Sequence, residues 1–178
     1  MAKKHFPLSK VYGLLEPGPV LLLTTAYRGA CDVMPMSWHS MLEFEPPLVS
    51  CVVSAGNYSH KLLRGSRQCV LNIPTVELAR KVIGCGNCSG TDVDKFSRFG
   101  LSRSPAQQVV APLLDDCFAS LECRITDTRF VRRYEMFGLE VVAAWVDTKL
   151  REPRTLHHRG YGKFMVAGET IKLPSRMR

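Results

Sequence analysis

The stretch YEMFGLEVVAAWV, residues 134–146, carries an apolar side chain at every second position from Phe137 to Trp145. Successive side chains of a strand point to opposite faces of a sheet, so this spacing predicts a long strand with one buried face. The residues on that face would be Phe137, Leu139, Val141, Ala143 and Trp145. The stretch ASLECRIT, residues 119–126, alternates in the same way and predicts a second half-buried strand.

The first half of the chain predicts four shorter strands, at residues 20–26, 33–39, 48–53 and 68–73. Turn residues separate them, including Arg28 and Gly29 after the first strand and the EPP sequence at 45–47 before the third. Pro35 lies inside the second strand. Because proline has no N–H to donate, we expect that strand to be an edge strand or an irregular one.

Three short helices are predicted between these strands, at residues 57–65, 75–83 and 91–99. Gly65 and Gly84 would end the first two, because glycine readily adopts the left-handed conformation found after a helix. Thr91 and Asp94 have the spacing of a capping box, which predicts that the third helix begins at Thr91 or Asp92.

The fold class follows from how these elements succeed one another. The strands cluster without a regular strand–helix–strand rhythm, which is typical of an antiparallel barrel or sandwich with a few helices rather than a doubly wound parallel sheet. The length of 178 residues suits one domain, and no repeat or long linker divides it. The tail from about Thr148 is expected to be basic and loop-like.

The charge balance is strongly basic, with 24 lysines and arginines against 16 aspartates and glutamates and a net charge of +8. Such an excess attracts polyanions, among them nucleic acid, an anionic membrane surface or a phosphorylated small molecule. The alternative is that the basic residues only keep the surface solvated. The longest aliphatic run, Val20 to Leu23, is far short of the roughly 20 residues of a membrane helix, so we expect no membrane association.

The cysteines favour a reducing compartment. There are seven of them, an odd number, and Cys51, Cys69 and Cys123 lie inside apolar strand patterns, where a free thiol packs as a small hydrophobic group. No apolar segment follows Lys3 and Lys4, so we expect no secretory signal. These features predict a cytoplasmic protein with reduced thiols.

The glycine-rich loop GCGNCSG, residues 84–90, comes close to a dinucleotide-binding fingerprint but has the wrong spacing and follows a predicted helix instead of a strand. Its Cys85 and Cys88 form a C-x-x-C pair, the pattern of a redox pair or of half a zinc site. Because no second pair has ligand spacing, we interpret the two thiols as structural and expect no metal.

Two further segments suggest a ligand. The segment MSWHS, residues 36–40, suits an aromatic wall with hydrogen-bond donors, as a flat heteroaromatic ligand requires. Asn57, Ser59 and Lys61 gather donors at a predicted helix start, where an anion is favoured, although a plain N-cap explains Asn57 or Ser59 as well. The loop HHRGYG, residues 157–162, is either a solvated basic loop or a donor-rich loop that meets a phosphate or an electron-rich ring.

An ordered set of motifs then carries a resemblance: GPVLLLTT at 18–25, MSWH at 36–39, EPPLV at 45–49, NIP at 72–74, SGTDVDKF at 89–96, TLHH at 155–158 and FMVAGET at 164–170. With these motifs the chain resembles the flavin reductase-like, FMN-binding split-barrel family over residues 6–171. The resemblance implies a mainly β fold, a Greek-key split β-barrel with a few short helices, as a single domain over residues 1–178. It also implies a homodimer with one FMN per subunit near the interface.

The resemblance assigns a cofactor site as well. The residues near the isoalloxazine ring or the ribityl chain would be Asp32, Trp38 and Tyr134, with Phe164 flanking the ring. The phosphate ligands would be Ser59 and Lys95. The other candidates around the cofactor are Ser37, His39, Asn57, Cys85 and Ser89.

Three functions remain open on the sequence. In the first, the protein is an FMN-dependent oxidoreductase, a flavin reductase that uses NAD(P)H, and the flavin carries the chemistry without a dedicated catalytic acid or base. The second is a flavoredoxin-type electron carrier that shares the pocket but takes electrons from a protein donor. The third is a polyanion- or nucleic-acid-binding module, which the net charge favours but no RNP-like aromatic motif supports.

Overall fold

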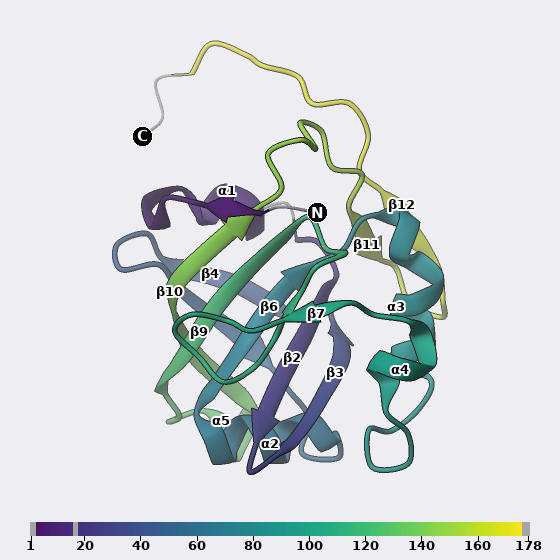
Figure 1. The fold of residues 1–178 in the computed structure, drawn as a ribbon. Helices are drawn as coiled ribbons and strands as arrows, with labels where there is room; N and C mark the ends of the chain where they lie inside the picture. The colour runs from purple at the N-terminus through teal and green to yellow at the C-terminus, as the bar shows by residue number, and fades with distance from the viewer. Residues whose placement is uncertain (1–2, 16–17, 176–178) are drawn as a thin grey trace.

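The computed structural model describes residues 3–15 and 18–175, and its centre is an eight-stranded antiparallel sheet (Figure 1). The strands follow the order β3-β2-β6-β9-β10-β5-β4, with β1 paired to β10. Their bounds are Lys4–His5 for β1, Leu21–Tyr27 for β2, Ala30–Met36 for β3, His39–Glu43 for β4, Leu48–Val52 for β5, Gln68–Ile73 for β6, Ala119–Asp127 for β9 and Met136–Val146 for β10. Two small hairpins join β7 (Arg103–Ser104) to β8 (Leu113–Leu114) and β11 (Leu156–His158) to β12 (Phe164–Val166).

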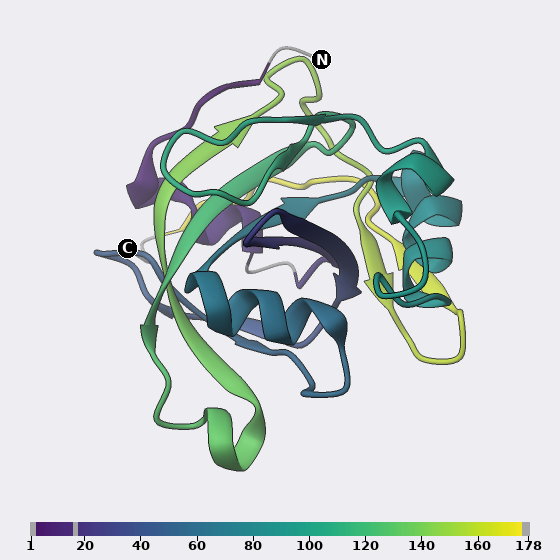
Figure 2. The same cartoon turned by 60° about the horizontal axis from the view of Figure 1, so that its bottom comes forward.

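The helices are short and lie around the sheet. They are α1 (Tyr12–Leu15), α2 (Tyr58–Ser66), α3 (Ala79–Gly86), α4 (Lys95–Phe99) and α5 (Val131–Tyr134), with 3-10 turns at Leu8–Lys10 and Val76–Leu78. Helix α2 lies across the lower end of the curled sheet and contacts β2, β3 and β6 (Figure 2). Helices α3 and α4 pack beside β3, at the opposite edge of the sheet from β4 (Figure 1).

The sheet is a split β-barrel, as the sequence predicts. Its two end strands, β3 and β4, form no ladder with each other in the described part of the chain. The prediction that Pro35 lies in an edge strand is confirmed, since β3 pairs only with β2 in the sheet. The predicted strand at 33–39 lies three residues too late in the chain, because β3 runs from Ala30 to Met36 and His39 already begins β4.

Hydrophobic clusters cover both faces of β2. Leu21 and Leu23 point into the barrel, where they pack with Leu71 and Phe137. Leu22, between them, belongs to a second cluster on the outer face that includes residues of α3 and α4. Because successive side chains alternate between faces, a strand buried on both sides needs the unbroken apolar run found here.

A β-bulge in β10 changes which residues face the barrel. The register with β9 shifts between Val141 and Ala143, so that Ala144 joins the barrel core. The prediction that Trp145 shares a face with Phe137 is therefore wrong. The Trp145 Nε1–H group instead donates to Oε1 of buried Glu122 at 2.7 Å on the outer face.

The ends of α2 and α3 differ from the predictions. Arg67, at φ 59°, takes the left-handed position after α2 that was expected of Gly65. Gly65 is required for packing, because a Cβ there would lie 2.5 Å from the ring of Tyr27. Helix α3 continues through Gly84 to Gly86, and a Cβ on Gly84 would lie 2.5 Å from the Phe99 ring.

The third helix begins later than its sequence suggests. Asp94, not Thr91, is the N-cap of α4, and its side chain accepts from the backbone N–H groups of Phe96 and Ser97. In the tail, predicted to be loop-like, the structure forms the β11–β12 hairpin. No helix in the described ranges is long and apolar enough to cross a bilayer.

Candidate functional site

Two adjoining cavities lie beside the edge strand β3. The polar cavity, of about 270 Å³, is lined by Asp32, Asn57, Tyr58, Ser89 and Lys95, among others. The apolar cavity, of about 400 Å³, is lined by Pro35, Met36, Ser37, His158 and Phe164, among others. Gly86 and Asn87 line both cavities, so the two meet at the end of α3. Together they fall within the roughly 300–1,000 Å³ of small-molecule sites.

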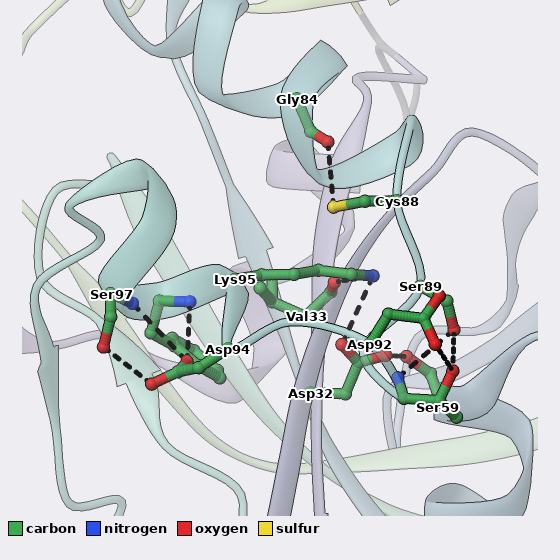
Figure 3. Close-up of polar contacts among 12 residues, drawn as sticks. Asp32, Val33, Ser59, Gly84, Cys88, Ser89, Asp92, Asp94, Lys95 and Ser97 are labelled. Atoms are coloured by element: carbon green, nitrogen blue, oxygen red, sulfur yellow. Dashed lines mark hydrogen bonds and ion pairs between the residues drawn. The ribbon is translucent and has the colours of Figure 1, made fainter.

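A buried polar cluster adjoins the polar cavity, which two of its members, Asp32 and Lys95, line; Figure 3 shows its polar contacts. The Ser59 hydroxyl donates to Oδ2 of Asp32 at 2.6 Å, and the Lys95 ammonium lies 3.3 Å from Oδ1 of the same carboxylate. Lys95 also donates to the Val33 carbonyl at 2.9 Å. All three side chains of the cluster (Asp32, Ser59 and Lys95) are at most 4% exposed. A buried charge requires such pairing, because leaving water is costly for an ion.

Each member of this cluster comes from a different element. Asp32 is on β3, Ser59 is in the first turn of α2, and Lys95 begins α4. Asp32 Oδ1 makes no hydrogen bond of good geometry despite being buried, so the ion pair with Lys95 is its main compensation. A ligand with hydrogen-bond donors in the polar cavity would supply the hydrogen bond that this oxygen lacks.

The start of α2 also faces the polar cavity, through Asn57 and Tyr58. Asn57 occupies the N-cap position but makes no side-chain cap, and its amide N–H donates to the Ser54 carbonyl at 3.3 Å. The first N–H groups of a helix have no partner within it, and together with the positive end of its dipole they favour a negative group.

The loop after α3 closes over the cluster at short range. A Cβ on Gly90 would lie 2.2 Å from Oδ1 of Asp32 and 2.9 Å from the Tyr58 ring. The loop is held by Ser89, whose hydroxyl lies 2.7 Å from Oγ1 of Thr91 and accepts from the Thr91 N–H. Glycine at this position therefore lets the backbone approach the acidic side chain.

The apolar cavity carries aromatic rings from the β11–β12 hairpin. The rings of His158 and Phe164 have centroids 5.2 Å apart and planes at 47°. Pro35 and Met36 of β3 also line this cavity, and Ser37 adds a hydroxyl. A flat aromatic group suits such a cavity, because aromatic rings and apolar side chains can pack against the faces and the edges of that group.

Several residues assigned from the sequence lie outside both cavities. Trp38 is 72% exposed between β3 and β4, and Tyr134 is 52% exposed at the end of α5. The His39 Nε2–H group donates to the Pro19 carbonyl at 2.7 Å, and burial lowers the pKa of His39. Cys85 is packed in the outer hydrophobic cluster and lines neither cavity, whereas the next residues along the chain, Gly86 and Asn87, line both.

Comparison with known proteins places this geometry in a family. The model of the flavin reductase like domain matches residues 14–165. The chain belongs to this family. The uncharacterized protein YddH from Escherichia coli is 29% identical over 172 residues, which is 89% of this chain and 91% of the relative.

Solved structures of the flavin reductase-like family share the fold. The FMN-binding domain of a flavin reductases-like enzyme from Shewanella baltica superposes with a TM-score of 0.92 at 25% identity, covering 97% of this chain and 98% of its own. Flavoredoxin from Desulfovibrio vulgaris superposes with a TM-score of 0.80 at 19% identity, covering 88% and 90%.

The site of this family member includes side chains that the sequence did not single out. They include Met34 and Tyr58 in the polar cavity and Pro35 in the apolar cavity. Pro35 directly precedes the MSWHS segment, whose first residue, Met36, also lines the apolar cavity. His158 lies in the basic loop that was left open, and the structure turns its ring toward Phe164.

Proposed function

We propose that the protein binds FMN in the groove that the polar and apolar cavities form together beside β3, here called the flavin groove. We further propose that it acts as an NAD(P)H-dependent flavin reductase. The observation that supports this is the pairing of a polar cavity at a helix start with an aromatic-lined cavity, joined at Gly86 and Asn87. FMN carries a phosphate at one end, which matches the polar cavity, and a flat ring at the other, which matches the apolar cavity. The family membership adds to this, because a similar solved structure is an FMN-binding domain.

The residues present fit the phosphate group in most respects. Asn57, Ser89 and the uncapped start of α2 offer neutral donors, and Lys95 offers a cation. Asp32 is the exception, because its carboxylate already neutralises Lys95. We propose that Lys95 is shared between Asp32 and the phosphate. Ser59 is fully buried and bonded to Asp32, so it acts on the phosphate through that residue.

When bound, FMN would supply the hydride and electron chemistry, and the protein would supply binding and orientation. The rings of His158 and Phe164 would hold the flat part of the cofactor against Pro35 and Met36. The Ser37 hydroxyl is positioned at the same wall to bond a polar edge. The polar cluster around Asp32 would set the position of the other end.

The proposed function is tested with purified protein. We expect it to bind FMN stoichiometrically and to show a bound-flavin absorbance that bleaches anaerobically on addition of NADH or NADPH. A protein that binds FMN but bleaches only with a reduced protein donor is instead the flavoredoxin-type carrier. A protein that takes up no FMN excludes both.

We also propose that the protein is a homodimer. Leu42, on the end strand β4, is 57% exposed, and Trp38, directly before that strand, is 72% exposed. An open strand edge with large apolar side chains is a surface that association covers. Light scattering should give about twice the subunit mass of 19.9 kDa, and Leu42→Lys should shift the protein toward the monomer. A wild-type monomer at micromolar concentration with flavin bound would contradict this.

The C-x-x-C pair is expected to be dispensable for flavin reduction. Burial raises the pKa of the Cys85 thiol to about 11, so it is protonated at neutral pH and unsuited to thiol exchange. The Cys88 thiol donates to the Gly84 carbonyl at 3.4 Å. Changing both residues to serine should leave FMN affinity and NAD(P)H reduction unchanged.

The same double variant should lose about 1–3 kcal/mol of stability, because a serine hydroxyl at position 85 would be buried among apolar side chains. The matched control is the double alanine variant, which buries no hydroxyl. Flavin that remains bound but is no longer reduced in either variant would show that the pair carries electrons.

A further inference from the structure

A third cavity lies apart from the flavin groove, between α2, α5 and the ends of β9 and β10. Its volume is about 510 Å³, and three arginines line it, Arg64, Arg67 and Arg132. We call it the arginine cavity. The residues lining it and those lining the flavin groove do not overlap. Ala55 lines the arginine cavity and the next residue, Gly56, lines the polar cavity, so the two are neighbours along the chain.

The cationic groups of the arginine cavity lack acidic partners. Among the described residues, none of its three guanidinium groups forms an ion pair with a carboxylate. Arg67 is held in place by a bond from Nη2 to the Ile125 carbonyl at 3.2 Å. Arginine carries several N–H donors in a planar fork, so an unpaired group of them favours anions with several oxygens.

One carboxylate, that of Glu135, also lines the arginine cavity. Its Oε1 atom accepts from the Ala55 backbone N–H at 2.6 Å. Burial and the nearby Arg64 lower the pKa of His60, so its imidazole is neutral near pH 7. The formal charge of the lining is then three positive and one negative, an excess of two positive charges.

The inner wall of the arginine cavity is apolar. Ile125 and Phe137 are buried there, and Val131 lies beside them. The His60 ring meets the Phe137 ring edge-on, with centroids 5.5 Å apart. A ligand that fills this cavity therefore combines an anionic group at the rim with a flat apolar group against the wall.

We propose that the arginine cavity binds a phosphate monoester carried by an aromatic small molecule. A phosphate monoester bears close to two negative charges at neutral pH, which matches the excess of the lining, whereas a carboxylate bears one. The 2′-phosphate of NADPH is one source of this group, and a nucleoside 5′-monophosphate is another. The proposal stands without the flavin and does not rest on the proposed function.

The experiment measures binding of 2′-AMP, 5′-AMP and adenosine to the flavin-free protein by calorimetry. We expect at least one nucleotide to bind, and adenosine to bind more weakly than that nucleotide by about tenfold or more, since bonds to charged groups are the stronger class. Arg64→Gln and Arg132→Gln should each weaken the nucleotide about tenfold or more. Arg80→Gln, a change at an exposed arginine of α3, is the matched control and should have no effect.

The two sources of the phosphate are separated by the same titrations. Tighter binding of 2′-AMP indicates the adenosine end of NADPH, and equal or tighter binding of 5′-AMP indicates a 5′-nucleotide. Adenosine that binds as tightly as both nucleotides would overturn the proposal. So would nucleotide binding that Arg64→Gln changes no more than Arg80→Gln does, or no nucleotide binding at millimolar concentration.

Discussion

Replacing Lys95 by methionine is expected to destabilise the flavin-free protein by about 3–5 kcal/mol, the cost of breaking a buried ion pair by removing one partner. The Lys95 ammonium lies 3.3 Å from Asp32, and the two residues are 4% and 2% exposed. Methionine is unbranched and one heavy atom shorter than lysine, so the change removes the charge and leaves little cavity. Asp32 would keep only its bond from Ser59.

The control is a second lysine with a carboxylate partner, in an exposed place. Lys81 lies 3.7 Å from Asp116, with both side chains one-third exposed. Lys81→Met should cost about 1 kcal/mol or less, because exposed ion pairs contribute little. The double variant Lys95→Met with Asp32→Asn should regain most of the lost stability, since no buried charge remains.

Urea denaturation followed by circular dichroism measures all of these variants. A similar small loss for Lys95→Met and Lys81→Met would contradict the view that Lys95 compensates Asp32. A double variant no more stable than Lys95→Met alone would do the same, because it would place the loss in packing and not in charge.

The sheet could be predicted from the sequence because its signals are local. Alternation over 119–126 and 134–146 and the apolar run at 20–23 each mark one strand, and the structure places β9, β10 and β2 there. The bulge in β10 could not be predicted, because it depends on the register with β9 and leaves the apolar spacing intact. Trp145 was therefore placed on the wrong face.

Helix ends were harder to predict because tertiary contacts decide them. Gly65 and Gly84 carry the usual sign of a helix end, yet both lie inside helices where an aromatic ring leaves no room for a Cβ. Arg67 ends α2 in the left-handed conformation despite its side chain. No local pattern reports such contacts, since Tyr27 and Phe99 are distant in sequence from the glycines they meet.

The candidate site, too, could be predicted from the sequence only in part. The resemblance to the flavin reductase-like family singled out Asp32, Ser59 and Lys95, and the structure brings them together. Their arrangement could not be predicted, because they come from three elements whose packing the sequence pattern does not report. The sequence assigned Ser59 and Lys95 directly to the phosphate, whereas in the structure both contact Asp32.

Lys95 is also expected to determine how much more tightly the protein binds FMN than riboflavin, which lacks the phosphate. Removing the Lys95 cation should weaken FMN by about 1.5–3 kcal/mol, roughly ten- to a hundredfold, as for a lost bond to a charged group. Riboflavin should bind almost unchanged. The Lys95→Met, Asp32→Asn double variant is used here, because it lacks the cation but should keep its fold.

The single variant Asp32→Asn should have the opposite effect on FMN affinity, although it leaves the buried Lys95 charge without its partner and therefore also lowers the stability of the flavin-free protein. Its amide keeps an acceptor for Ser59 and removes the charge that competes with a phosphate for Lys95. FMN should bind more tightly than to the wild type, by about tenfold, and should raise the melting temperature by more than it does in the wild type. Flavin fluorescence quenching and thermal melts measure these quantities.

The pair of variants identifies which group meets the phosphate, because the two changes move FMN affinity in opposite directions from one ion pair. A structural disturbance of the groove would weaken both flavins in both variants. Equal shifts for FMN and riboflavin would therefore show that Asp32 and Lys95 do not act on the phosphate. An Asp32→Asn variant that loses FMN but keeps riboflavin would mean that the carboxylate orients Lys95 toward the phosphate instead of competing for it.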